Sequence, residues 1–283
     1  MTAISIDPVA CTRCGACVAV CSHRVFSGVG EVADATRCKA CGHCMAVCPA
    51  DAVRHDAFPL DACPPVASVP NLDTLTALLR ERRSCRIFAK RPVAREMVAK
   101  LVDTARWVPS ASNGQPVDWL AIDDPARIAA LSAGALGVLG ATAQILRNPL
   151  ARLVLYLTHG KEKVASAARR ADGFDEMLAR HAAGEDPIFF HAPVVLIAHV
   201  PKSDYFGRDD AVYAAYNLMI AARTQGLGTC QIGFFQVALN RSPGLRAALQ
   251  LPPDRAPQVA LVLGYPRYEF KRLMPRREPE ITW

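Results

Sequence analysis

The sequence predicts an α+β protein built from two domains, a small cysteine-rich domain followed by a larger domain of mixed helices and strands. Three observations lead to this prediction. The chain has 283 residues, which is too long for one small domain. Eight of its 11 cysteines lie before residue 50. After a proline-rich stretch at residues 63–70, helical and strand-like patterns alternate. We therefore expect domains at residues 1–62 and 71–283, joined by a linker at 63–70.

The cysteines of the first domain form two runs of the same design, CTRCGACVAVC from Cys11 and CKACGHCMAVC from Cys38. All four cysteines recur at an offset of 27 residues, so the domain contains an internal duplication. The spacing is typical of bacterial ferredoxins with two [4Fe–4S] clusters, in which the fourth cysteine of each run serves the other cluster. The expected ligand sets are Cys11, Cys14, Cys17 and Cys48 for one cluster, and Cys38, Cys41, Cys44 and Cys21 for the other.

Zinc and disulfides are the alternative uses for so many thiols. A structural zinc site takes four ligands, usually as two separated pairs, whereas each run here holds four cysteines separated by two, two and three residues. Disulfides need an oxidising compartment. The first ten residues, MTAISIDPVA, have neither a basic region nor a long apolar stretch, so we expect a cytoplasmic protein. Two clusters are the favoured interpretation.

The composition also bears on partners. The formal net charge is +7, and the excess lies after Ala62. Basic residues are not gathered with aromatic ones into a nucleic-acid-binding run, so we expect no nucleic acid. The most apolar stretch, from Leu131 to Gly160, is interrupted by Arg147, Pro149 and Arg152. No apolar run is expected to reach the length of a membrane span, and the protein is expected to need no membrane.

The larger domain begins with NLDTLTALLRERR, in which leucines recur at helical spacing behind Asn71 or Asp73 as a cap. A second helix is expected over residues 98–105. The runs VDWLAI, PVVLIAHV and QVALVLGY have the composition of strands. Between the last two lies AVYAAYNLMIAARTQGLG, which predicts a buried helix that Gly226 ends.

Three separated stretches are suited to ligand binding. RRSCRIF, residues 82–88, places three arginines and a serine together, and arginine binds phosphate through a rigid fork of donors. PSASNGQP, residues 109–116, offers amides that can donate and accept. GLGTCQIGFF, residues 226–235, exposes backbone groups. Its glycines end a helix instead of opening one after a strand, so it is not a dinucleotide-binding fingerprint.

Together with GYPRYEFKRLMPRREP near the end, these stretches resemble, in order, the motifs of the nitroreductase family of FMN flavoproteins. The resemblance covers residue 72 to the C-terminus except residues 126–186. The flavin-binding residues that it implies are Arg82, Arg83, Ser84, Arg86, Ser110, Asn113, Gln115, Gln231, Ile232, Gly233, Arg276 and Arg277. Among these, Arg82, Ser84 and Arg86 would hold the phosphate and ribityl chain, with Arg276 completing the phosphate site. Asn113 and Gln115 would lie at the ring edge, and the backbone amides of Ile232 and Gly233 would face N5 and O4.

The resemblance further implies an intertwined homodimer with FMN between subunits and a C-terminal arm that crosses to the partner. A low-potential donor such as ferredoxin would pass electrons through both clusters to FMN. The flavin would then reduce a small organic acceptor: a nitroaromatic, a quinone, an activated alkene or a halogenated ring. Residues 126–186 would form a substrate lid. Two alternatives stay open: an electron-transfer subunit that serves a partner enzyme, and an NAD(P)H-dependent reductase with vestigial clusters.

Overall fold

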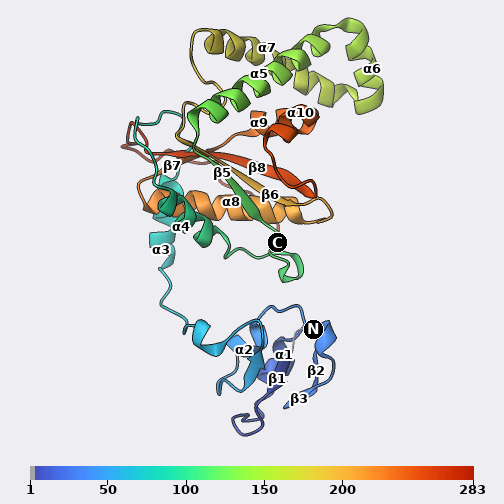
Figure 1. Cartoon of the computed structure of the whole chain (residues 1–283), viewed down its shortest axis with the longest axis vertical. Helices are drawn as coiled ribbons and strands as arrows, with labels where there is room; N and C mark the ends of the chain where they lie inside the picture. Colours follow the sequence, from blue (N-terminus) through green and yellow to red (C-terminus); the bar gives the residue numbers. More distant parts are fainter. Residues whose placement is uncertain (1–3) are drawn as a thin grey trace. The chain divides into compact units, whose positions relative to one another are not determined.

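The computed structural model describes residues 4–283, so the first three residues of the expected cysteine-rich domain lie outside the described part. The chain divides into two compact units. The first comprises residues 1–70 together with Pro109–Gln115, and the second comprises Asn71–Val108 and Pro116–Trp283. The mixture of helices and strands confirms the α+β prediction (Figure 1).

The first unit consists of two small antiparallel ladders and two short helices. The strands are β1 (Ile4–Ile6), β2 (Phe26–Gly28), β3 (Glu31–Val32) and β4 (Val53–His55), and the helices are α1 (Ala16–Val20) and α2 (His43–Ala46). Strand β1 pairs with β4, and β2 pairs with β3. Val25, Phe26, Met45 and Val53 are buried beside the cysteines and form a core that is small for a domain.

The duplication in the sequence is also present in the backbone. Gly15 (φ 78°) precedes α1, and Gly42 (φ 75°) precedes α2 at the equivalent position of the second run. The positive φ angles of Arg13 (56°) and Ala40 (47°) are related in the same way. Left-handed conformations strain non-glycine residues. The two cysteine loops therefore share one tightly constrained conformation.

The second unit is a three-layer sandwich around a four-stranded antiparallel sheet of order β5-β6-β8-β7. Its strands are β5 (Asp118–Ile122), β6 (Val194–Pro201), β7 (Gly228–Gln231) and β8 (Arg255–Gly264). Its helices are α3 (Leu72–Glu81), α4 (Arg95–Ala105), α5 (Pro125–Arg147), α6 (Pro149–His159), α7 (Lys161–Ala182), α8 (Gly207–Thr224), α9 (Gly233–Arg241) and α10 (Pro243–Ala248). The three strand-like runs of the sequence correspond to β5, β6 and β8.

Helices cover both faces of this sheet (Figure 1). Along β6, Val195 and Ile197 join the core under α5, α7 and α9. Val194 and Leu196, which point to the other face, join the core under α4 and α8. Because both faces are covered, β6 is a continuous apolar run instead of an alternating one.

The expected helix boundaries follow local capping. The side chain of Asn71 accepts a hydrogen bond from Thr74 N at 2.9 Å and caps α3, so Asn71 is the cap and Asp73 lies in the first turn. Helix α8 ends before Gly226, whose φ of 69° suits the left-handed position after a helix. The capping signals in the sequence located both boundaries.

The stretch at residues 126–186 forms the three helices α5, α6 and α7 on one side of the sheet. By length and composition, α5 could cross a membrane, whereas the sequence prediction was that no apolar run reaches this length. The prediction overlooked that no charged residue falls between Arg127 and Arg147. Leu131, Leu136 and Leu139 of α5 are buried against the core of the second unit.

Gly228 at the start of β7 has no room for a side chain. A Cβ atom there would lie 2.6 Å from Cys85 Cβ and 2.9 Å from Pro266 Cγ. We expect Gly228→Ala to destabilise the protein by about 1–3 kcal/mol, because the segment that contains Cys85 must move away from β7.

The matched control is Gly137→Ala in α5, where a Cβ would meet no atom within 4 Å. This change should stabilise the protein by about 1 kcal/mol, because alanine favours the helix. Chemical denaturation of both variants measures the two effects. Equal stability of the two variants would contradict the tight contact at Gly228.

Candidate functional site

The eight cysteines of the first unit surround two separate small cavities. Residues that line the first include Cys11, Cys14, Cys17 and Cys48. Residues that line the second include Cys21, Cys38, Cys41 and Cys44. Each cavity thus receives three cysteines from one run and the fourth from the other run. The structure brings together the same two sets that the ferredoxin spacing implies.

Each cavity is lined by four thiols, the number that a four-iron cluster binds. In the described part of the chain, no group of three or more His, Cys, Asp or Glu side chains is close enough to hold one metal ion. A four-iron cluster is wider and binds one thiolate at each of its irons. Backbone amides already point at the sulfurs: Ala52 N lies 3.2 Å from Cys48 Sγ, and Val25 N lies 3.4 Å from Cys21 Sγ. Such N–H···S contacts stabilise thiolates and tune cluster potentials.

The thiols differ in acidity. Burial raises the pKa of the Cys44 thiol to about 11. Burial also opposes ionisation of Cys48, but the backbone N–H groups of Ala50, Ala52 and Val53 outweigh it and lower the pKa of that thiol. Because metal ligands must be deprotonated, binding of a metal cluster by these thiols would release protons.

In the second unit, the RRSCRIF segment lies along the edge of the sheet beside β7. Ser84 forms a parallel bridge with Thr229, and Cys85 N donates to Thr229 O at 2.9 Å. Farther along, Ala89 N donates to Tyr265 O at 2.8 Å. The fold therefore brings the first motif, the GLGTCQIG motif and the GYPR motif to one edge.

Two cavities lie at this edge, one at each end of the paired segments. The first, which we call the basic cavity, has a volume of about 420 Å³ and is lined by residues that include Arg82, Arg83, Arg223, Lys271 and Arg272. Glu81 and Glu269 also line it and pair with Arg223 and Lys271, so its excess positive charge comes from Arg82, Arg83 and Arg272. Arg82 Nε is buried and has no hydrogen-bond partner within the described residues. A buried guanidinium N–H without an acceptor is costly, and an anionic ligand would satisfy it.

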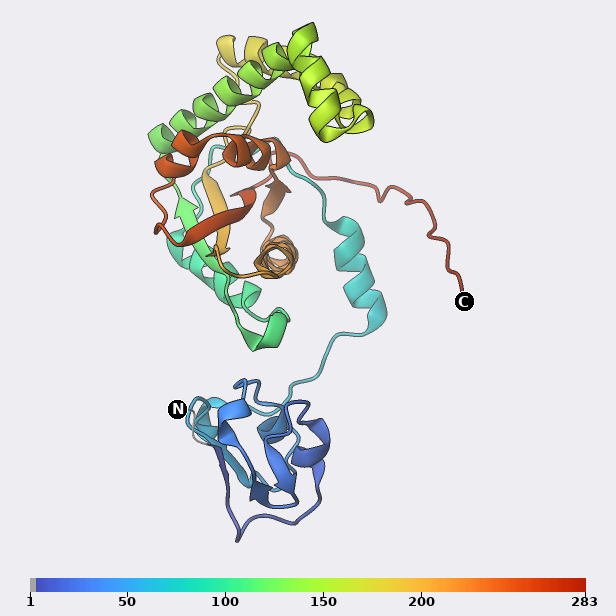
Figure 2. The same ribbon diagram turned by 90° about the vertical axis from the view of Figure 1, so that its right-hand side faces the viewer.

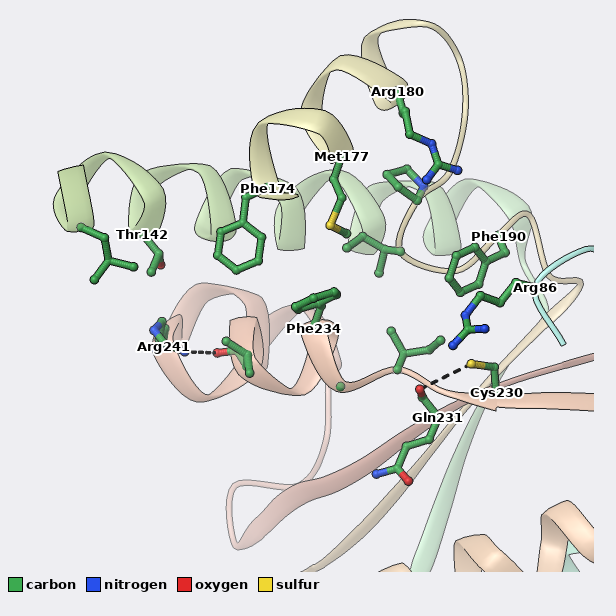
Figure 3. A pocket seen from close by; sticks show the side chains of 16 residues that line it. Arg86, Thr142, Phe174, Met177, Arg180, Phe190, Cys230, Gln231, Phe234 and Arg241 are labelled. Atoms are coloured by element: carbon green, nitrogen blue, oxygen red, sulfur yellow. Dashed lines mark hydrogen bonds between the residues drawn. The ribbon is translucent and has the colours of Figure 1, made fainter. Parts of the chain in front are cut away.

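The second, which we call the aromatic cavity, has a volume of about 690 Å³. The lining residues are Arg86, Thr142, Leu146, Phe174, Met177, Arg180, Pro187, Ile188, Phe190, Cys230, Gln231, Ile232, Gly233, Phe234, Val237 and Arg241. Side chains from α5 and α7 form one wall and side chains from α9 form the opposite wall (Figure 3). A Cβ on Gly233 would meet nothing within 4 Å, so open space lies beside the backbone at this position. A planar molecule could approach this backbone closely.

The structure separates residues that the sequence grouped. Arg82 lines the basic cavity, whereas Arg86 lines the aromatic cavity with Gln231, Ile232 and Gly233. The paired segments run from one cavity to the other, because residues 82–85 and 226–229 belong to the basic end and residues 86 and 230–233 belong to the aromatic end. The structure therefore does not bring Arg86 to the same anion site as Arg82.

Other expected site residues line neither cavity. The PSASN loop belongs to the first unit, in which Asn113 Nδ2 donates to Ala40 O at 2.7 Å. Gln115 N donates to Ser110 Oγ at 3.0 Å, which fixes the shape of the loop. Arg276 and Arg277 lie in an exposed C-terminal segment that runs away from the sheet without regular structure (Figure 2).

The sequence reasoning missed several cavity residues. Arg223 and Arg241 are isolated basic residues near the ends of α8 and α9, and nothing in the local sequence distinguishes them from ordinary surface arginines. The aromatic side chains Phe174 and Phe234 come from α7 and α9 and contact each other edge to face, with 5.6 Å between ring centroids. Only the fold places them together.

A polar cluster at the end of β8 was also missed. The guanidinium of Arg255 donates through Nε to His199 Nδ1 at 3.0 Å and through Nη2 to Pro116 O at 3.0 Å, and it pairs with Asp118. Burial lowers the pKa of His199, and the positive charge of Arg255 adds to the effect. Because Nδ1 accepts from Arg255, His199 is neutral in this arrangement. The cluster fixes the chain at Pro116, where the PSASNGQP loop joins the sheet.

Comparison with known proteins finds a matching family model for a part of each unit. Residues 79–265, well over half of the chain, match the model of the nitroreductase family. The chain belongs to the nitroreductase family. Residues 3–49 match the model of a 4Fe-4S dicluster domain, so the nitroreductase domain is fused to a ferredoxin-like region. The expectation of an oxidoreductase of nitroreductase type is thereby confirmed.

The similar curated proteins share the nitroreductase domain. The chain is 28% identical over 209 residues to nitrobenzene nitroreductase of Ectopseudomonas oleovorans, covering 70% of this chain and 88% of the relative. It is 31% identical over 198 residues to 5,6-dimethylbenzimidazole synthase of Rhodospirillum rubrum, covering 70% and 84%. A 4-nitrobenzoate reductase of a Nocardioides species is 27% identical over 229 residues, covering 73% and 86%.

Solved structures of low sequence identity confirm the fold. An FMN-bound nitroreductase of Desulfitobacterium hafniense superimposes with a TM-score of 0.53 at 19% identity, covering 76% of this chain and 99% of the other. Iodotyrosine deiodinase bound to FMN and 3-iodo-L-tyrosine gives a TM-score of 0.52 at 19% identity, covering 74% and 98%.

The lowered pKa of His199 makes stability depend on pH in a defined direction. Below its ordinary value of 6.5, the unfolded chain takes up a proton at His199 more readily than the folded chain does. Stability is therefore full above this value and falls as the pH drops toward the folded pKa. We expect His199→Asn to lose less unfolding free energy than the parent between pH 7.5 and pH 5, measured by urea denaturation. Equal losses would show that His199 does not titrate in this window.

Proposed function

We propose that the protein is a ferredoxin-fused, FMN-dependent reductase. Electrons from a low-potential donor pass through two [4Fe–4S] clusters to FMN and on to a small organic acceptor. The observation that supports this most is the convergence of eight cysteines on two cavities, in one chain with a nitroreductase domain that has a basic and an aromatic cavity. A four-iron cluster carries single electrons, whereas FMN accepts them singly and delivers them in pairs.

The residues present fit the two clusters. Cys11, Cys14, Cys17 and Cys48 would hold one, and Cys21, Cys38, Cys41 and Cys44 would hold the other. The donor set is entirely thiolate, which suits iron–sulfur clusters. Amide contacts to Cys21 and Cys48 occupy equivalent positions in the two runs, so both sites are built to the same plan.

The residues also fit FMN. Arg82, whose buried Nε lacks an acceptor, and Arg83 would bind the phosphate in the basic cavity. Arg86 and the backbone of Ile232 and Gly233, at the aromatic end of the paired segments, would face the isoalloxazine ring. The family resemblance also implies Ser84, Gln231, Arg276 and Arg277 of the second unit as flavin-binding residues. From the loop that is grouped with the first unit, it implies Ser110, Asn113 and Gln115.

A homodimer accounts for the apolar surface of the second unit. Large apolar side chains are exposed on several segments, among them Leu72, Leu75 and Leu79 of α3; Val212, Tyr213 and Tyr216 of α8; and Phe270, Leu273, Met274, Ile281 and Trp283 of the C-terminal segment. Monomers rarely expose so many large apolar groups on neighbouring elements. In the proposed dimer, the C-terminal arm crosses to the partner and carries Arg276 and Arg277 into its flavin site.

The aromatic cavity distinguishes an enzyme from a pure electron-transfer subunit. A subunit that only transfers electrons to a protein partner needs room for the flavin ring alone, whereas this cavity of about 690 Å³ also extends away from Ile232 and Gly233 to Thr142 and Arg241. Pockets of this size and lining are typical of small-molecule sites. Helices α5 and α7 would then act as the substrate lid.

The route of the electrons can be tested by removing one ligand from each cluster. We expect the parent to contain about eight iron atoms per chain. The double variant Cys14→Ala/Cys41→Ala should retain FMN but lose turnover driven by reduced ferredoxin, because the entry path is broken. Its photochemically reduced flavin should still react with the acceptor.

Cys63→Ala is the matched control, since Cys63 is an exposed cysteine outside both cavities. This variant should behave like the parent. Stoichiometric zinc in place of iron would disprove the cluster assignment. Turnover of the double variant with NAD(P)H at the parent's rate would place electron entry at the flavin.

The flavin phosphate site can be tested at Arg82. Arg82→Ala removes a charge-assisted contact worth on the order of 1.5–3 kcal/mol, so the Kd for FMN should rise at least about tenfold. Equilibrium dialysis followed by flavin fluorescence measures the loss. Arg80→Ala, which changes an exposed arginine in the last turn of α3 outside the basic cavity, is the control. Equal retention by both variants would refute the assignment.

A further inference from the structure

The aromatic cavity has a charge pattern that narrows the class of acceptor. Among its 16 lining residues are three arginines, Arg86, Arg180 and Arg241, and no Asp or Glu. The apolar lining includes three phenylalanines and Met177. An apolar slot with unbalanced positive charge favours a planar aromatic molecule that carries a negative charge. This inference rests on the proposed function, since it concerns the acceptor of the same site.

The three arginines are not equivalent. Arg180 is already neutralised, because its guanidinium pairs with Glu185 at 2.8 Å. Arg86 lies at the end of the cavity that the flavin ring would occupy, and it is near the ring of Phe190. Arg241 donates only a long bond of 3.3 Å to Val237 O of its own helix, and it forms no ion pair within the described residues. Away from the end where the flavin ring is proposed to lie, Arg241 is therefore the cavity arginine whose charge is not paired within the described residues.

The position of Arg241 indicates how a ligand would be oriented in the aromatic cavity. Figure 3 shows Arg241 and Thr142 at one end of the cavity and Arg86, Cys230 and Gln231 at the other, with Phe174, Met177 and Phe234 between them. Phe174 and Phe234 contact each other edge to face, with 5.6 Å between ring centroids, and form one aromatic patch in the cavity lining.

We propose that the acceptor is an aromatic compound with an anionic substituent, such as a carboxylate or sulfonate, on the side of the ring opposite its reducible group. Arg241 binds the anionic substituent through charge-assisted hydrogen bonds. The ring lies in the part of the cavity that Phe174, Met177 and Phe234 line. The reducible group then points toward Ile232 and Gly233, where the flavin ring is proposed to lie. For a nitro group, one electron pair from the reduced flavin and two protons give the nitroso compound and water.

The test compares acids with their neutral amides on the full-length holoprotein. The flavin is reduced photochemically without excess reductant, and its reoxidation is followed by absorbance. The probes are 4-nitrobenzoate and 4-nitrobenzenesulfonate against 4-nitrobenzamide and 4-nitrobenzenesulfonamide. The parent should have an apparent Kd for the acids at least about tenfold below that for the amides, the range expected for one charged hydrogen-bonded contact.

Two variants with the same change of charge separate a local contact from general electrostatics. Arg241→Gln should bring the ratio between acid and amide close to one. Arg152→Gln on α6, outside the cavity lining, should leave the ratio as in the parent. No acid preference in the parent, or the same preference in Arg241→Gln, would overturn the proposal.

A binding measurement keeps this inference separate from the proposed function. Calorimetry of the oxidised holoprotein with benzoate and benzamide reports on recognition without any reaction. If benzoate binds the parent but not Arg241→Gln, the anion site is supported, even if no probe reoxidises the flavin. Failure of every probe to reoxidise the flavin would contradict the proposed reductase, not the anion site. If benzoate binds no better than benzamide, the anion site is wrong whatever the reaction shows.

Discussion

The close packing of residues 84–88 against β7 is the contact on which the candidate flavin site depends. Cys85 and Gly228 approach so closely that no side chain fits at residue 228. The bridge between Ser84 and Thr229 then sets the segments parallel and in register. Because of this register, one end of the pair has Arg82 at the basic cavity, and the other has Arg86 and Gly233 at the aromatic cavity. A change of register would separate these groups.

The two layers of helices, one on each face of the larger sheet, have different structural roles. Helices α4 and α8 fill one face of the sheet with a tightly buried core that includes Leu101 and Leu218. Helices α5 and α7 cover the other face but also extend over the aromatic cavity, where Phe174 and Met177 lie. The apolar character of α5 therefore serves a core and a cavity wall. This explains why a helix of a nitroreductase-family protein has the length and composition of a membrane span.

The first unit is held together differently. Its apolar core is small, and several loop residues, including Arg13, Ala40 and Asp51, adopt left-handed conformations that cost free energy. A metal cluster bound in each cavity would offset these costs, because binding to a preformed site adds directly to folding free energy. In the proposed holoprotein, the stability of this unit is therefore coupled to cluster binding.

From the sequence alone, the duplicated cysteine runs, the caps of α3 and α8, three of the four strands of the larger sheet and the family motifs could be predicted. These features are local or depend on spacing along the chain, and spacing is fully visible in a sequence. It also gave the crossed sets of cysteines that the structure gathers around two cavities.

The sequence could not show that Arg82 and Arg86, four residues apart in one motif, line different cavities, because this depends on the fold. Only the tertiary structure joined Arg255 to His199 and Pro116, and it alone placed Phe174, Phe234 and Arg241 around one space. These side chains come from elements far apart along the chain. Their meeting depends on how helices pack on a sheet, a long-range outcome that no local pattern encodes.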